Sequence, residues 1–147
     1  MITKEISDFV DKVKLGFIAT VCPDGTPNLS PKGSTIAWDS EHLVFADACS
    51  PGTIANLRVN PSIEINVVDI FVRKGFRFKG TAQVLSEGAV FDEVVSAYKA
   101  RGSTLKINNI VLVKVVSVQA VISPAYDAGA TEDELRKRWM EYWSLSS

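Results

Sequence analysis

Residues 15–61 read LGFIATVCPDGTPNLSPKGSTIAWDSEHLVFADACSPGTIANLRVNP. Short apolar runs alternate here with turn residues, a pattern that predicts β-strands joined by tight turns. The first strand covers residues 15–21, and Pro23-Asp24-Gly25 reverses the chain into a second strand at residues 27–36. These two strands are predicted to pair as a β-hairpin.

The rest of this stretch predicts one more strand and a short helix. A turn at residues 39–41 leads into a strand at residues 43–46. Pro51-Gly52-Thr53 is typical of a helix start, and we expect Thr53 to cap a helix over residues 54–59. A helix therefore interrupts a run of strands.

The flanking segments extend a mainly β pattern. Helical spacing of apolar residues predicts helices at residues 3–13 and 87–100, and a capping pattern at Thr131 opens a final helix. Further strands are predicted at residues 63–68, 76–85, 110–116 and 118–122. The last two are apolar enough for burial on both faces or in an interface.

The number and spacing of these elements indicate a fold class. About six or seven strands, with turns every 8 to 12 residues or so, favour a closed or partly closed antiparallel barrel over βαβ units. The chain has 147 residues, of which 46% are hydrophobic and 22% charged, so we expect one domain spanning residues 1–147.

Charge and cysteine content exclude several functions. A formal net charge of -1 gives no overall attraction to nucleic acid or to an anionic membrane, so any anion site must be local. The amphipathic start is not a signal peptide and no apolar run reaches the length of a membrane span, so we expect a cytoplasmic protein. Cys22 and Cys49 lack a metal-binding spacing, and we interpret them as reduced thiols.

The predicted helix start at residues 51–53 suits a phosphate group. Backbone N–H groups, the Thr53 hydroxyl and the positive end of the helix dipole lie together there, and Arg58 adds charge one turn later. The alternative is an ordinary capped helix with a solvated arginine.

Ser30-Pro31-Lys32-Gly33-Ser34 suits the edge of a flat ligand such as a flavin. Its Pro and Gly allow close approach to the backbone, whose polar groups can bond a flavin pyrimidine ring, and Lys32 near N1 and O2 favours the anionic reduced ring. The alternative is an irregular edge strand protected by Pro and Lys.

Other candidate motifs point away from common enzyme classes. Residues 73–79 interleave basic and aromatic side chains, but the overall charge argues against nucleic acid, and we expect Phe76 and Phe78 in the core. Arg77 or Lys79 can alternatively face a phosphate bound by a neighbouring strand or subunit. His42 has no nucleophile at a triad spacing, and neither a Rossmann nor a P-loop motif is present.

In their order along the chain, these motifs resemble the pyridoxamine 5'-phosphate oxidase-like, FMN-binding split-barrel family. The resemblance covers most of the chain, including GFIATV at 16–21, DGTP at 24–27, SPKGS at 30–34, LVFA at 43–46 and the segments 53–61, 78–82 and 111–118. It implies a six-stranded antiparallel split barrel that forms a homodimer with FMN between the subunits.

The resemblance also implies a set of cofactor-binding residues. Residues 30–34 would contact the flavin ring and ribityl chain, and Lys79 or Tyr126 of the partner subunit would complete the site. The full set is Ser30, Pro31, Lys32, Gly33, Ser34, Ala46, Asp47, Gly52, Thr53, Asn56, Leu57, Arg58 and Lys79. Many relatives carry a cation where this chain has Gly52, so the phosphate charge must come from Arg58, Lys32 or elsewhere.

The implied function is that of a flavoenzyme. FMN would pass a hydride or electrons through N5 from a small-molecule donor to a small acceptor, with no side chain acting as a nucleophile. The substrate-binding Arg and His segment of the vitamin B6 oxidases has no counterpart here. A non-catalytic FMN-binding electron carrier or storage protein is the alternative, and a deazaflavin or haem in place of FMN is a third interpretation.

Overall fold

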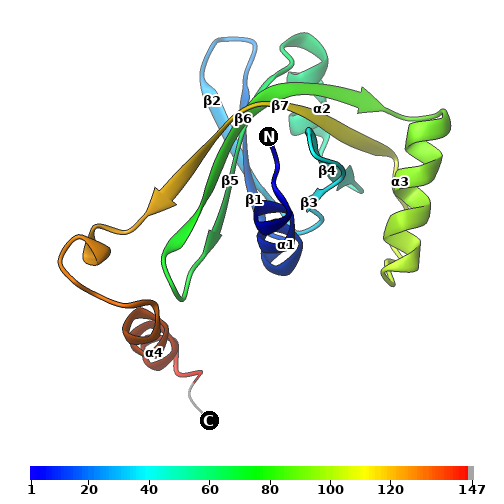
Figure 1. Ribbon diagram of the computed structural model, residues 1–147. Coiled ribbons are helices and arrows are strands. Elements are labelled where there is room, and N and C mark those ends of the chain that lie inside the picture. The colour runs from blue at the N-terminus through cyan, green and yellow to red at the C-terminus, as the bar shows by residue number, and fades with distance from the viewer. Residues whose placement is uncertain (146–147) are drawn as a thin grey trace.

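The computed structural model describes residues 1–145. Seven strands and four α-helices follow one another along the chain (Figure 1). In order, they are α1 (Lys4–Val13), β1 (Gly16–Val21), β2 (Pro27–Lys32), β3 (Ile36–Ala37), β4 (His42–Asp47), α2 (Pro51–Val59), β5 (Ser62–Asp69), β6 (Lys74–Leu85), α3 (Ala89–Ala100), β7 (Asn109–Ile122), the 3-10 turn η1 (Pro124–Tyr126) and α4 (Glu132–Tyr142).

All seven strands belong to one antiparallel sheet, in the order β2-β1-β5-β6-β7-β4-β3. The two edge strands, β2 and β3, are joined by only three residues, because β2 ends at Lys32 and β3 begins at Ile36. A chain that short spans no more than about 15 Å, so the sheet must curl until its two edges come near each other. The result is a half-barrel, with a seam between β2 and β3.

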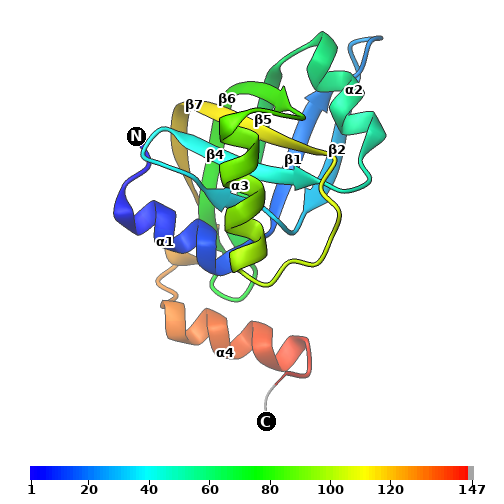
Figure 2. The same ribbon diagram turned by 90° about the vertical axis from the view of Figure 1, so that its right-hand side faces the viewer.

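Two helices fill the two sides of this curled sheet. The apolar face of α1 packs into the main core, where Phe9 meets Phe76 edge-to-face with ring centroids 5.3 Å apart. Val94 and Tyr98 of α3 pack with Ile36 of β3 in a second cluster near the seam. Figure 2 shows α3 in front of the sheet, α1 at its lower left and α4 below both helices.

Two expectations from the sequence need correction. The sheet has seven strands instead of the implied six, because the predicted strand at residues 27–36 is broken by a turn and its end pairs with β4 as β3. In that turn, the Thr35 hydroxyl donates to the Lys32 carbonyl at 2.8 Å. Helix α2 begins at Pro51 after the N-cap Ser50, so Thr53 lies inside its first turn and does not cap it. Proline is well tolerated at that first helical position.

The burial of the two long strands, β6 and β7, can be compared with what the sequence predicts. The predicted apolar face of β6 is confirmed, with Phe78 and Ala82 buried. Strand β7 is one continuous strand, buried in its first half and largely exposed beyond Val115, with a register shift opposite Lys79 and Gly80. Burial on both faces therefore extends only to Val113, because Lys114 is exposed, and burial of the rest in an interface stays a prediction. Among residues 1–145, no helix is long and apolar enough to cross a membrane.

Candidate functional site

A groove of about 720 Å³ opens beside the seam of the half-barrel. Three segments form most of its walls: the end of β2 with the turn after it, the connection from β4 to α2, and the end of α3 with the loop after it; the end of α1 and the start of β3 add one residue each. Its lining residues are Lys14, Pro31, Lys32, Gly33, Ser34, Ile36, Ala46, Ala48, Cys49, Ser50, Tyr98, Arg101, Gly102, Ser103 and Leu105. The groove therefore joins most of the predicted ring-contact region to Ser50 at the start of α2, whereas Ser30, Asp47, Gly52 and Thr53 do not line it.

Lys32 reaches from β2 to the start of α2. Its Nζ donates to the Ser30 hydroxyl at 2.9 Å and to the Ser50 hydroxyl at 2.5 Å. Partial burial lowers the pKa of Lys32, and the nearby Asp47 carboxylate partly opposes this shift. A partly desolvated ammonium at a helix start favours the binding of an anion.

Asp47 connects Ser50, at the start of α2, to Asn109, at the start of β7. The carboxylate is 5% exposed, and it accepts from the Ser50 backbone N–H at 2.6 Å and from the Asn109 amide at 2.9 Å. Asn109 in turn accepts from the Arg58 guanidinium at 3.4 Å. Asp47 is thus occupied by protein donors, and its role is to position Ser50.

The floor of the groove is fixed by Ser34 and Tyr98. The Ser34 hydroxyl accepts from the Ala46 backbone N–H at 2.9 Å, which joins the turn after β2 to β4. The Tyr98 hydroxyl donates to the Ser34 carbonyl at 2.6 Å and so anchors α3 to the same turn. Burial raises the pKa of Tyr98, so this phenol stays a hydrogen-bond donor.

The start of α2 leaves backbone groups available to a ligand. The Ser50 hydroxyl makes no capping bond to the helix because it accepts from Lys32. Ile54 N–H donates to Ser50 O, and proline has no N–H, so Gly52 and Thr53 supply the free N–H groups of the first turn. Gly52 is exposed, whereas Thr53 is buried as a whole residue, so the Gly52 N–H is the accessible one of the two.

Three predicted site residues on α2 serve the fold. The Asn56 amide is buried and donates to the Thr20 hydroxyl at 3.0 Å, and Leu57 lies in the main core. Arg58 is exposed and lies against Asn109, one step from Asp47. None of the three lines the groove.

Lys79 lies apart from the groove, on the outer face of the sheet. It lines a separate hollow with Val21, Glu64 and Val116, among others. Tyr126 is also distant, because its hydroxyl donates to the Val72 carbonyl at the tip of the β5–β6 hairpin. Within one subunit, the structure therefore does not bring these two residues to the predicted site.

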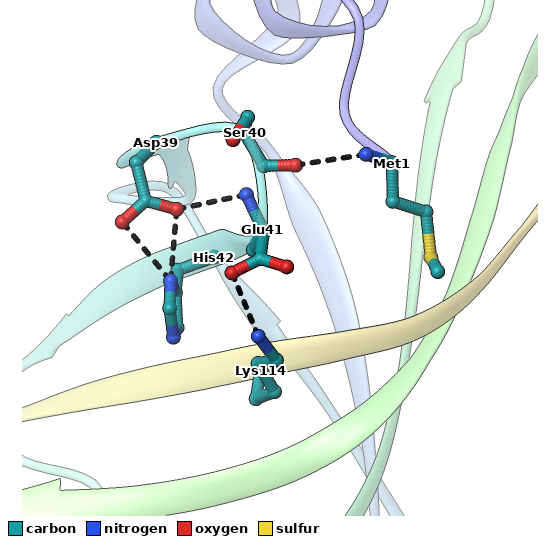
Figure 3. A network of polar contacts seen from close by, with 6 residues as sticks. All are labelled: Met1, Asp39, Ser40, Glu41, His42 and Lys114. Carbon is teal, nitrogen blue, oxygen red and sulfur yellow. Dashed lines mark hydrogen bonds and ion pairs between the residues drawn. The ribbon is translucent and has the colours of Figure 1, made fainter.

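His42 belongs to a surface network of polar contacts (Figure 3). Its Nδ1 lies 2.8 Å from an Asp39 carboxylate oxygen, and Glu41 pairs with Lys114 at 2.8 Å. The Met1 amino group donates to the Ser40 backbone carbonyl. These contacts fix the β3–β4 turn against β7, and among the six residues drawn no hydroxyl or thiol nucleophile contacts the imidazole.

Sequence reasoning missed the α3 wall of the groove. Tyr98 fell within the predicted helix at residues 87–100 without a site role, and Arg101 and Leu105 carried no motif. Their role depends on contacts across more than 60 positions, such as the bond from Tyr98 to Ser34, which no local pattern predicts. The missed role of Ser50 had a local signal, because it directly precedes a proline at a helix start.

Comparison with known proteins gives consistent matches. The family model described as Pyridoxamine 5'-phosphate oxidase matches residues 2–122. Group A Streptococcus HupZ is 30% identical, with a TM-score of 0.75 over 84% of this chain and 96% of that chain. An FMN-binding protein from Syntrophomonas wolfei subsp. wolfei shares the fold at 16% identity, with a TM-score of 0.68 over 82% of this chain and 86% of that chain. An F420 reductase shares it at 21% identity, with a TM-score of 0.61 over 80% of this chain and 98% of that chain.

Proposed function

Because this chain belongs to the pyridoxamine 5'-phosphate oxidase family, we propose that it is an FMN-binding flavoprotein and an oxidoreductase. Members with this fold include an FMN-binding protein and an F420 reductase. The proposed reaction passes a hydride or electrons through flavin N5 from a small donor to a small acceptor. FMN supplies that chemistry when bound, and the protein supplies the groove and its charges.

The observation that carries this proposal is the position of Lys32. Its ammonium and the Ser50 hydroxyl meet where the groove reaches the start of α2, and the first turn of that helix follows directly after Ser50. The groove lining among the described residues has three charged side chains, and all are cations: Lys14, Lys32 and Arg101. The whole chain, in contrast, has a formal net charge of -1. This local excess of positive charge favours an anionic ligand over a neutral one.

The residues present also fit the flat part of FMN. A Cβ at Gly33 would meet nothing within 4 Å, so the backbone of the turn after β2 is open to a ring. Pro31 and Ser34 line the groove on either side of this turn, and Ser30 is linked to it through the hydrogen bond that its hydroxyl accepts from Lys32. We assign Lys32, Ser50 and the backbone of Gly52 to the phosphate, and the other residues of 30–34 with Ala46 to the ring and ribityl chain.

A homodimer belongs to the same proposal. The outer face of the sheet exposes Phe17, Leu29 and Val116, and the Oδ1 of Asn66 on that face is buried without a hydrogen-bond partner. A second copy placed on this face would cover the apolar side chains and bring the partner subunit's Lys79 toward a flavin. Sedimentation at micromolar concentration tests this point, because a stable monomer would remove any role for Lys79.

The electron-carrier alternative draws support from the composition of the groove. Among the described residues its lining holds neither a histidine nor a carboxylate, the side chains that most often serve in general acid–base catalysis. Stopped-flow mixing separates the two functions. An oxidoreductase that uses nicotinamides reduces its flavin quickly with NADH or NADPH, whereas a carrier responds slowly to them and quickly to a reduced protein.

The decisive experiment is the visible absorption spectrum of the purified protein. We expect flavin absorption that is released on denaturation and restored when FMN is added to the flavin-free protein. A colourless protein that FMN does not reconstitute would contradict the proposal. Absorption typical of a deazaflavin or haem would assign the groove to that group instead.

A further inference from the structure

We infer that a separate groove between α1 and α4, here called the α1–α4 groove, binds a free carboxylate that carries an apolar chain, such as a medium-chain fatty acid. Its walls are the end of α1 with Leu15, the end of β5 with the turn after it, and one face of α4. It shares no lining residue with the groove beside the seam. Its volume is about 490 Å³, within the range of about 300 to 1,000 Å³ that is ordinary for small-molecule sites.

Helix α4 is fixed next to the tip of the β5–β6 hairpin (Figure 1). The guanidinium carbon of Arg73, in that tip, lies 3.6 Å from the centroid of the Trp139 ring, a cation–π contact. Leu135, one turn earlier in α4, is only 1% exposed. Arg136 and Met140 are four positions apart and therefore share one face of the helix, and both line the α1–α4 groove. The α4 wall is thus held in place before any ligand binds.

Most of the lining of the α1–α4 groove is apolar. Leu15 and Val13 contribute from the end of α1, Ile70 and Phe71 from the hairpin turn, and Met140 from α4. Leu15 is 37% exposed and Ile70 is 44% exposed, so apolar surface remains open to a ligand. Covering such surface with a hydrocarbon chain is favourable, and the flexible Met140 can adapt to the shape of that chain.

Two cations from different helices also line the α1–α4 groove: Lys12 of α1 and Arg136 of α4. Among residues 1–145, neither of these side chains forms an ion pair. Both are therefore available to a ligand, and a carboxylate is the group that an ammonium and a guanidinium bind most directly. Apolar walls beside two unpaired cations match a ligand that has an apolar chain and one carboxylate.

The acidic side chains near these cations do not cancel this charge. Asp69 also lines the α1–α4 groove, but its carboxylate accepts from two backbone N–H groups of the hairpin turn, at 2.9 and 3.3 Å. Glu132 and Glu5 lie in an adjacent hollow, where Glu132 pairs with Lys74 at 3.0 Å and Glu5 is exposed to solvent. Two cations and one carboxylate leave the lining of the α1–α4 groove with a formal charge of +1.

Calorimetric titration of the purified protein with octanoate tests this inference. We expect saturable binding of one octanoate per chain. Hexanoate should bind about tenfold more weakly, because its chain has two fewer CH₂ groups to bury. Octan-1-ol should also bind about tenfold more weakly, because it lacks the charge that Lys12 and Arg136 recognise. The Lys12→Gln/Arg136→Gln double variant should bind octanoate no better than octan-1-ol.

Lys137→Gln/Arg138→Gln is the matched control, because it removes the same charge from exposed positions of α4 outside the groove lining. It should bind octanoate as wild type does, whereas Ile70→Asn, at a wall position, should weaken binding about tenfold. Absence of saturable octanoate binding to wild type, or equal binding by the two double variants, would overturn the inference. A loss of self-association in Ile70→Asn, measured by sedimentation, would also overturn it, because a second copy of the chain would then cover this groove.

Discussion

The Nζ of Lys32 lies 2.5 Å from the hydroxyl of Ser50, the residue that precedes the first turn of α2. This contact joins a strand end to a helix start across 18 positions of sequence. It turns the Ser50 hydroxyl away from the helix and leaves the first-turn N–H groups without a side-chain cap. The pair therefore forms the corner of the groove on which the proposed cofactor depends.

Lys32→Gln should weaken FMN binding roughly 10- to 100-fold, as expected for loss of one charge-assisted hydrogen bond to phosphate. Titration of flavin-free protein with FMN, followed by absorbance, measures this change. The flavin reduction potential separates the two roles considered for Lys32. It should stay unchanged if Lys32 contacts the phosphate, and it should fall if Lys32 lies near N1 of the ring.

FMN affinity should decrease as the pH rises through the lowered pKa of Lys32, because a bound phosphate favours the charged ammonium. The stability of the flavin-free protein should change in the opposite direction. Burial disfavours the charged form in the folded state, so the unfolded chain binds more protons in the alkaline range between the lowered and the ordinary pKa, and stability rises with pH there. Denaturant unfolding across that range, with Lys32→Gln as reference, measures the effect, and equal slopes in both proteins would contradict it.

Gly52→Arg should strengthen FMN binding, by about tenfold at most, because it adds a cation beside the free N–H groups of α2. A Cβ at this position meets nothing within 4 Å, so the substitution needs no rearrangement. Gly52→Ala is the control: it should raise stability by up to about 1 kcal/mol without changing affinity. A gain in affinity in both variants would assign the effect to helix stability instead of charge.

Tyr98→Phe should destabilise the protein by about 1 to 2 kcal/mol, because the Ser34 carbonyl loses its donor in a partly buried place. Faster FMN dissociation should accompany this loss, since the groove floor is no longer tied to α3. Tyr142→Phe is the control: it removes a hydroxyl from a side chain that is 68% exposed, and it should leave both stability and FMN release unchanged. Thermal unfolding and stopped-flow release of FMN check both variants, and equal behaviour would rule out the role given to Tyr98.

Local patterns predicted most of the fold because residue types in this chain mark its turns and helix caps clearly. The capping box at Thr131 and Glu134 and the apolar face of β6 were both predicted and both formed. The break between β2 and β3 was not predicted, because it depends on the Thr35 hydroxyl bonding to a backbone carbonyl within a strand-like sequence.

The candidate site was predicted only on the side formed by consecutive motifs. Lys32 and the start of α2 carried local signals, and they meet in the structure. Arg101 carried none, because its place at the groove follows from the packing of α3 against β3 and β4. The assignment of Thr53 as a cap was wrong, since Pro51 begins the helix earlier.

The seam between β2 and β3 has a consequence for how the molecule opens. Both strands are edges of the sheet and only three residues connect them, so the amides near the seam are expected to exchange with deuterium sooner than those of central β6. A molecule bound in the groove touches the end of β2, the start of β3 and β4 at once. Such a molecule would connect the two edge strands, so we expect the amide exchange of β2 and β3 to slow together on binding, while the amide exchange of distant α4 stays the same.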